Sequence, residues 1–163
     1  VNMGFDVKMS EIHGMAQRGG SVTTQIKYGD KVYSPSIGTG EADVVVAFEK
    51  VEAVRWLPFL KRGGTLIVND YEVYPLPVLI EKEKYPPNVL EALKSSVERV
   101  KVVPAARMAE DLGNVRAQNI VLLGVLVKVL GLDALDWVQL LKEHVPPRFH
   151  DINVKALQAG LAA

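Results

Sequence analysis

The sequence contains no cysteine. This excludes disulfides, a thiolate nucleophile, cysteine-ligated zinc and any iron–sulfur cluster held by cysteines of this chain. A chain without cysteine is compatible with a reducing compartment, and we expect a cytoplasmic location. The chain also has no Asn-x-Ser/Thr acceptor for glycosylation.

The chain also lacks an excess of either charge. Lys and Arg total 19, and Asp and Glu total 19, with no block of one sign. The general attraction that nucleic acids and anionic membranes require is therefore absent, and we expect neither as a partner. The most apolar stretch, residues 120–132, is interrupted by Lys128 and two glycines. A bilayer span needs about 20 apolar residues, so this stretch predicts a buried helix.

The composition is that of a globular domain, with 48% hydrophobic residues in 163. Short β-branched runs alternate with helical patterns, which predicts an α/β fold in one domain over residues 1–163. The expected strands are 5–9, 22–28, 31–33, 43–48, 65–69 and 100–103. The expected helices are 49–61, 88–97, 105–112, 115–130, 134–144 and 149–160.

Glycine and proline place the predicted turns. Gly29-Asp30 predicts a tight hairpin turn between strands 22–28 and 31–33. Pro58 should kink helix 49–61 or tighten its last turn, and Gly63-Gly64 should end that helix. Gly113 should stop the helix before it.

Other segments are expected to be loops. Residues 10–20 and 34–40 predict loops, and residues 71–87, with four prolines, predict an irregular segment. By contrast, the unbroken run 43–48 is typical of a strand buried on both faces.

Three candidate motifs have a plain structural interpretation. Gly38-Thr39-Gly40 lacks the third glycine of a dinucleotide fingerprint and precedes a strand, so it predicts an ordinary loop. His144, His150 and Asp151 are conceivable metal ligands, but nothing in their spacing demands a metal. The alternating charges of residues 81–84 predict a solvated surface.

The segment 10–22 concentrates groups that bind anions and move protons. Consecutive amides at Gly19 and Gly20 can converge on an anion, and Arg18 can grip a carboxylate or phosphate with two bonds. His13 can carry a proton near neutral pH. The alternative is a surface turn whose glycines serve only its geometry, and the residues alone leave both interpretations open. The candidate site residues are Glu11, His13, Gly14, Gln17, Arg18, Gly19 and Gly20.

The string Ser-Glu-Ile-His-Gly-Met-Ala-Gln-Arg-Gly-Gly-Ser-Val at residues 10–22 resembles the signature of the gamma-type subunit of 2-oxoacid:ferredoxin oxidoreductases. The similarity is greatest to the indolepyruvate type and continues through Val32-Tyr33-Ser34-Pro35 to Asn153. The resemblance implies a Rossmann-like three-layer domain with a mostly parallel sheet, a β-hairpin insertion and a helical C-terminal part.

The chain departs from this family at its beginning. Family members usually open with a strand and a Gly-x-Gly-Gly-Gln-Gly turn, and this sequence starts about where the following helix ends. We therefore expect a domain truncated at its N-terminus, with an exposed sheet edge or an uncovered apolar face.

The resemblance implies an accessory subunit that is inactive alone. The complex would oxidatively decarboxylate a 2-oxoacid, here an aryl pyruvate such as indolepyruvate, to an acyl-coenzyme A. Thiamine diphosphate, magnesium and iron–sulfur clusters would lie in a large partner subunit, and ferredoxin would take electrons from the complex. Coenzyme A is then a cosubstrate, and this chain holds no cofactor or metal.

Three functions remain open. In the first, the 10–22 segment faces the partner and helps close its active-site channel around the 2-oxoacid carboxylate or a coenzyme A phosphate. In the second, the chain is a structural interaction subunit of the same complex. In the third, it is a free-standing Rossmann-like nucleotide-binding module, which the missing glycine fingerprint disfavours.

Overall fold

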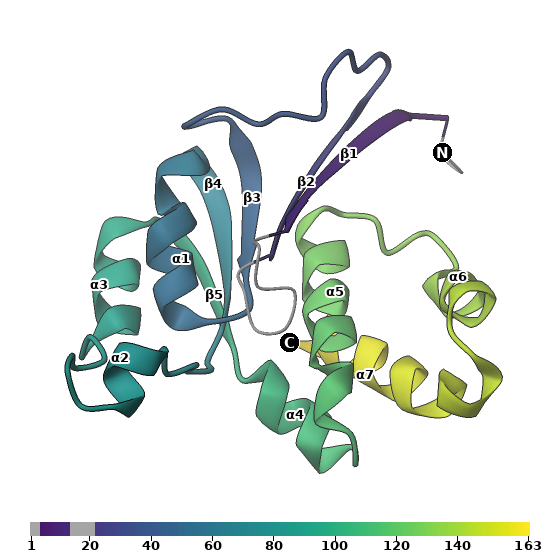
Figure 1. Cartoon of the computed structure of the whole chain (residues 1–163). Coiled ribbons are helices and arrows are strands. Elements are labelled where there is room, and N and C mark those ends of the chain that lie inside the picture. The colour runs from purple at the N-terminus through teal and green to yellow at the C-terminus, as the bar shows by residue number, and fades with distance from the viewer. Residues whose placement is uncertain (1–3, 14–21) are drawn as a thin grey trace.

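A parallel three-stranded sheet forms the centre of the molecule. The computed structural model describes residues 4–13 and 22–163. Strands β3 (Ala42–Ala47), β4 (Leu60–Asn69) and β5 (Arg99–Val103) lie in the order β3-β4-β5, with β4 in the middle. Helices cover both faces of this sheet (Figure 1), which confirms the predicted three-layer α/β arrangement.

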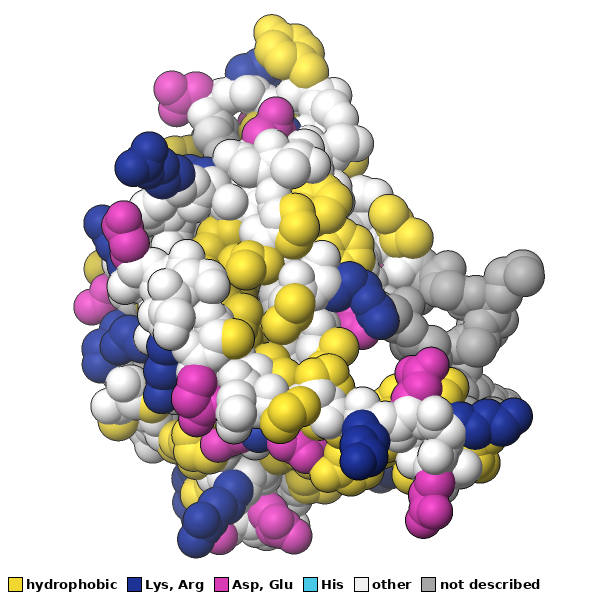
Figure 2. Space-filling view, turned by 90° about the vertical axis from the view of Figure 1, so that its left-hand side faces the viewer, with side chains coloured by type: hydrophobic (Ala, Val, Ile, Leu, Met, Phe, Trp, Pro, Cys, Tyr) yellow, Lys and Arg dark blue, Asp and Glu magenta, His cyan; other side chains and the backbone are white. Residues whose placement is uncertain are grey.

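Each face of the sheet packs on its own set of helices because side chains alternate along a strand. Leu66 and Val68 are fully buried on the side of α1 (Lys50–Trp56) and α3 (Val89–Ser96). Ile67 is fully buried on the other side, in the cluster formed with α4 (Ala105–Asp111), α5 (Gln118–Val129) and α7 (His150–Ala162). Figure 2 views the α1–α3 side, where hydrophobic side chains gather toward the middle and charged ones lie around the rim.

The expected β-hairpin exists, but its pairing differs from the prediction. Strand β1 (Asp6–His13) pairs antiparallel with β2 (Val22–Gly29) in a separate two-stranded sheet. Residues 10–13 therefore extend the first strand, and residues 31–33 form no strand. Asp6 accepts a hydrogen bond from the Val32 amide at 3.0 Å, which holds the segment after Gly29 as a loop beside β1.

The prediction that Gly63-Gly64 ends a helix was wrong. Helix α1 stops at Trp56, Pro58 lies in a 3-10 turn (Leu57–Phe59), and β4 has already begun at Leu60. Gly63 has a φ of +72°, and the pairing with β3 shifts register between Ala42 and Val44. A β-carbon at Gly64 would lie 2.9 Å from the Asp43 carbonyl oxygen. The glycine pair thus permits the positive φ and the close backbone approach at an irregularity within β4.

Strand β3 is only partly buried. Its valines, Val44 to Val46, have intermediate exposure, so the expectation of complete burial on both faces was wrong. The physical reason is its position: β3 is an edge strand of the three-stranded sheet.

The remaining helices follow the predicted order. A short helix, α2 (Leu76–Leu79), lies within the segment expected to be irregular. Helix α4 ends just before Gly113, whose φ is +96°, as predicted. Helix α6 (Trp137–His144) begins later than predicted because Asp136 accepts the Gln139 amide at 2.9 Å and caps it. Within the described part of the chain, no helix combines the length and apolar character that crossing a membrane requires.

Candidate functional site

The structure places part of the predicted 10–22 segment. Glu11 lies in β1 with an exposed side chain, and His13 is the last residue of that strand. Gly14, Gln17, Arg18, Gly19 and Gly20 lie outside the described residues. The anion-binding role of this segment therefore stays a prediction.

The structure also places the other motifs. Gly38-Thr39-Gly40 lies in the loop before β3, where the Gly40 amide donates to the Pro58 carbonyl at 2.9 Å. His144 Nδ1 lies 2.8 Å from the Leu140 carbonyl oxygen, and His150 Nε2 lies 2.7 Å from that of Val145. Across residues 4–13 and 22–163, no three His, Asp or Glu side chains come together as a metal site requires. Residues 81–84 are exposed, as predicted.

A polar cluster occupies the carboxyl edge of the sheet, where open α/β sheets build their sites. Glu49 follows β3 and caps α1 by accepting the Glu52 amide at 2.9 Å. Its carboxylate also accepts a hydrogen bond from the Tyr85 hydroxyl, although 36 residues separate the two. Glu49 is 7% exposed, so this buried carboxylate depends on its donors.

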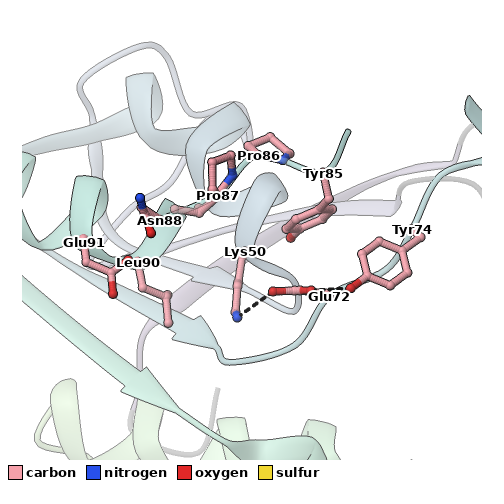
Figure 3. A pocket seen from close by; sticks show the side chains of 10 residues that line it. Lys50, Glu72, Tyr74, Tyr85, Pro86, Pro87, Asn88, Leu90 and Glu91 are labelled. Carbon is pink, nitrogen blue, oxygen red and sulfur yellow. Dashed lines mark hydrogen bonds and ion pairs between the residues drawn. The ribbon is translucent and has the colours of Figure 1, made fainter. Parts of the chain in front are cut away.

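Lys50, which follows β3, forms ion pairs with two carboxylates that follow β4. Its ammonium lies 2.8 Å from Asp70 and 3.0 Å from Glu72. The hydrogen bond to Asp70, followed by that to Glu72, raises the pKa of Lys50 above its ordinary value. The Tyr74 hydroxyl donates to Glu72 at 2.7 Å and lowers the pKa of that carboxyl. Figure 3 shows the Lys50–Glu72–Tyr74 chain of contacts.

A hollow of about 330 Å³ opens beside this cluster (Figure 3). The rings of Tyr74 and Tyr85 meet edge to face at 5.3 Å on one side of it. Its cation, Lys50, is already paired with the carboxylates of Asp70 and Glu72, and Glu91 adds a further negative charge to the lining. The hollow therefore suits a hydrogen-bond donor or a cation better than a phosphate or carboxylate. Its lining comprises Lys50, Glu72, Tyr74, Tyr85, Pro86, Pro87, Asn88, Val89, Leu90 and Glu91.

Asn69 fixes the geometry of this edge. Its side chain is fully buried at the end of β4, and its Nδ2 donates to the Phe48 carbonyl at 3.2 Å and to Gln118 Oε1 at 3.0 Å. Its Oδ1 accepts the Ala105 amide at 3.0 Å and the Ala106 amide at 3.4 Å. One amide thus joins the end of β3, the start of α4 and the start of α5.

We expect Tyr85→Phe to lower the free energy of unfolding by about 1–2 kcal/mol at pH 7, because Glu49 loses a donor in a buried position. Burial, and then the hydrogen bond to Glu49, raises the pKa of Tyr85 above its ordinary 10.0. Because the pKa is raised on folding, this contribution is complete below pH 10 and declines as the pH rises through the folded-state value.

Urea unfolding from pH 7 to pH 11 measures this effect. The difference in free energy of unfolding between wild type and Tyr85→Phe should stay constant to about pH 9 and become smaller above about pH 10. Tyr33→Phe, at a tyrosine that is 89% exposed, is the control and should change stability by less than about 0.5 kcal/mol. Equal stability of Tyr85→Phe and wild type at pH 7 would contradict the prediction.

Comparison with known families identifies the chain. The family described as pyruvate ferredoxin/flavodoxin oxidoreductase matches residues 1–163. The chain belongs to this family.

Two relatives support the assignment. The chain is 36% identical over 167 residues to the indolepyruvate oxidoreductase subunit IorB of Pyrococcus horikoshii, covering 98% of this chain and 82% of that protein. It is 28% identical over 165 residues to the 2-oxoglutarate synthase subunit KorC of Methanothermobacter thermautotrophicus, covering 96% and 78%.

Solved structures of the oxidoreductase family share the fold. The gamma subunit of a keto/oxoacid ferredoxin oxidoreductase from Geobacter sulfurreducens superposes with a TM-score of 0.66 at 23% identity, covering 99% of this chain and 84% of that one. A 2-oxoglutarate:ferredoxin oxidoreductase from Magnetococcus marinus matches with a TM-score of 0.60 at 17% identity. There, 98% of this chain matches 26% of a longer chain. The predicted α/β fold of a gamma-type subunit is confirmed.

Sequence reasoning missed the carboxyl-edge cluster in this oxidoreductase subunit. Open α/β folds build their sites where strands end, and segment 10–22 follows the first predicted strand. The same rule applies to Glu49, two residues after β3, and to Asp70, directly after β4. That signal was available in the sequence. The partnership of Glu49 with Tyr85 was not, because it depends on a contact between distant segments.

Proposed function

We propose that this chain is the small subunit of a 2-oxoacid:ferredoxin oxidoreductase that acts on indolepyruvate or another aryl pyruvate. The observation that carries the proposal is the family match over the whole chain, together with 36% identity to an indolepyruvate oxidoreductase subunit. The reaction is the oxidative decarboxylation of the 2-oxoacid, with coenzyme A accepting the acyl group and ferredoxin accepting the electrons. We place this activity in the cytoplasm and only in the assembled complex.

The proposal assigns the cofactors to a large partner subunit. Clusters ligated by cysteine cannot belong to this chain, because none of its 163 residues is cysteine. The donor set of the carboxyl-edge cluster also offers no anion-binding cradle for a diphosphate, since Lys50 is already paired with Asp70 and Glu72. Thiamine diphosphate with magnesium, when bound by the partner, supplies the carbanion chemistry. Ferredoxin would dock on the partner, because this chain has no net charge to steer it.

Within the complex, we assign the anionic group of the substrate or of coenzyme A to segment 10–22. Arg18 and the amides of Gly19 and Gly20 would bind that group, while His13 and Gln17 would orient it and exclude water. The carboxylate-rich lining of the hollow at the sheet edge supports this division, because it disfavours an anion there. Glu11 and Gly14 complete the proposed segment.

Dye reduction by the reconstituted complex tests the proposal. With coenzyme A present, indolepyruvate should be turned over faster than pyruvate or 2-oxoglutarate. Arg18→Ala should raise KM for the 2-oxoacid or coenzyme A by roughly tenfold or more, because a charge-assisted hydrogen bond contributes about 1.5–3 kcal/mol. Arg62→Ala, at an exposed arginine of β4, is the control and should leave KM unchanged.

Two results would count against these assignments. A preference for pyruvate or 2-oxoglutarate would contradict the aryl-pyruvate substrate. Unchanged kinetics of Arg18→Ala in a fully assembled complex would remove the anion-binding role of the segment.

The second candidate is a purely structural subunit of the same complex. The exposed apolar side chains of β1 and β2 favour it, because such a surface is typical of a protein interface. Under this alternative, variants in segment 10–22 lose assembly and show no separate kinetic defect. A free-standing nucleotide binder has less support, since Gly38-Thr39-Gly40 lies before a strand and no helix follows it directly.

A further inference from the structure

One face of the β1–β2 hairpin is predominantly apolar and open to solvent. Residues directly opposite each other in an antiparallel pair point to the same side of the sheet. Val7 pairs with Tyr28 and Met9 pairs with Ile26, so these four side chains share one face. Their exposed fractions are 37%, 46%, 61% and 53%, and Val22, four residues before Ile26 on the same face, is 56% exposed. The exposed pair Glu11 and Thr24 lies between them on this face. Within the described residues the Phe5 ring contacts Tyr28 edge to face at 5.6 Å, and all five apolar side chains still remain more than a third exposed.

The opposite face is polar except for Ile12, and it lies against the chain's own loop. Asp6 accepts the Val32 amide, Gln25 Oε1 accepts the Ile37 amide at 2.9 Å, and Lys27 lies 3.4 Å from Glu41. The segment of residues 30–41 thus follows the polar side of the hairpin and connects it to β3 (Figure 1). The usual arrangement of an antiparallel sheet is reversed here: the polar face is partly covered and the apolar face is exposed.

This reversal has an energetic consequence. A two-stranded hairpin is marginally stable in water unless a third strand or a helix covers its apolar face. Exposed apolar area contributes no burial energy in the isolated chain, and contiguous patches of this kind mark interaction sites. Contact of this face with an apolar surface of a partner would therefore stabilise the hairpin.

The area of the hairpin face indicates which kind of partner can cover it. Each strand has eight residues, so at about 3.4 Å per residue and about 4.8 Å between strands the face spans roughly 300 Å². Two copies packed hairpin to hairpin would bury roughly 600 Å², about half of the ~1,200 Å² at the lower limit of a stable interface. A second copy is therefore a poor occupant, whereas a large subunit can cover the hairpin together with neighbouring surface.

We propose that the apolar face formed by Val7, Met9, Val22, Ile26 and Tyr28 docks on the large catalytic subunit of the oxidoreductase. The inference rests on the proposed function, which supplies that partner. The partner surface would be apolar at this point, because the side chains that the hairpin offers are apolar.

A charge-pair variant tests the docking face. Met9→Lys combined with Ile26→Glu removes two apolar side chains from a directly opposed pair, while the new charges attract each other and preserve the hairpin. We expect at least tenfold weaker binding of the full chain to the catalytic subunit, measured by isothermal titration calorimetry. Leu79→Lys is the matched control, since Leu79 is 64% exposed in α2, away from the hairpin, and should bind as wild type does.

The possible results separate the inference from the proposed function. If wild type binds the catalytic subunit and restores turnover, but the double variant binds equally well, the docking face is wrong. If wild type self-associates in sedimentation experiments and the double variant is monomeric, the occupant is a second copy and the inference also fails. If wild type neither binds nor restores turnover, the proposed function itself fails. Unfolding curves of the double variant that overlay those of wild type confirm that weaker binding does not reflect a lost fold.

Discussion

Gly160→Ala should destabilise the chain by about 3 kcal/mol or more, which is a large part of the ~5–15 kcal/mol that a domain of this size has. A β-carbon at Gly160 would lie 2.0 Å from the Val121 carbonyl oxygen and 3.0 Å from the α-carbon of Gly124. These are backbone atoms of α5, so no rotamer change can relieve the contact. Helix α7 would have to move away from α5, and the cluster around Val121 and Ala156 would open.

Urea unfolding monitored by circular dichroism measures this loss as a lower midpoint. Replacing glycine with alanine inside a helix ordinarily gains up to about 1 kcal/mol, so a loss would come from the contact with α5 and not from helix propensity. Gln158→Ala, at an exposed position of the same helix, is the control and should change stability by less than about 0.5 kcal/mol. A midpoint for Gly160→Ala equal to or above that of wild type would show that α5 and α7 are not packed this closely.

Asn69→Ala should have the other large effect, a loss of about 3–5 kcal/mol. The fully buried amide makes four hydrogen bonds, and alanine makes none of them. The amides of Ala105 and Ala106 and the carbonyl of Phe48 would lose this partner at a site that water does not reach. An unsatisfied buried group costs about 1–3 kcal/mol, and several such groups are involved here.

Thermal and urea unfolding of Asn69→Ala test this estimate. Asn119→Ala is the control, because Asn119 is exposed near the start of α5 and its side chain bonds only to the adjacent Ile120 amide among the contacts described. It should remain within about 0.5 kcal/mol of wild type. A loss below about 1 kcal/mol for Asn69→Ala would mean that the carboxyl edge of the sheet is not held by this amide.

Much of the central sheet could be predicted from the sequence. The β-branched runs 43–48, 65–69 and 100–103 correspond to β3, the second half of β4 and β5, because parallel strands packed by helices select such residues. Gly63-Gly64 was assigned to a helix end, but glycine pairs occur both at helix ends and at irregularities within strands, and the sequence does not distinguish the two. The hairpin was misplaced for a similar reason. Gly29-Asp30 has the composition of a tight turn, but the true partner of β2 is the strand before it.

The candidate site was less accessible to sequence reasoning. Local patterns pointed to Arg18 and its neighbours, whose role stays a prediction, as does the single-domain organisation of residues 1–163. The cluster of Glu49, Lys50, Asp70 and Tyr85 depends on contacts between segments far apart in the chain, which periodicity does not encode. The reversed polarity of the hairpin became visible only once its register was known.

One measurement tests the central claim that this chain is a subunit of a 2-oxoacid:ferredoxin oxidoreductase. Indolepyruvate-dependent, coenzyme A-dependent dye reduction is followed for the catalytic subunit of the source organism alone, for this chain alone, and for the two together. We predict turnover only when the two are combined, rising with added chain until it saturates at a fixed molar ratio. Full activity of the catalytic subunit alone, with no change when this chain is added, would contradict the account.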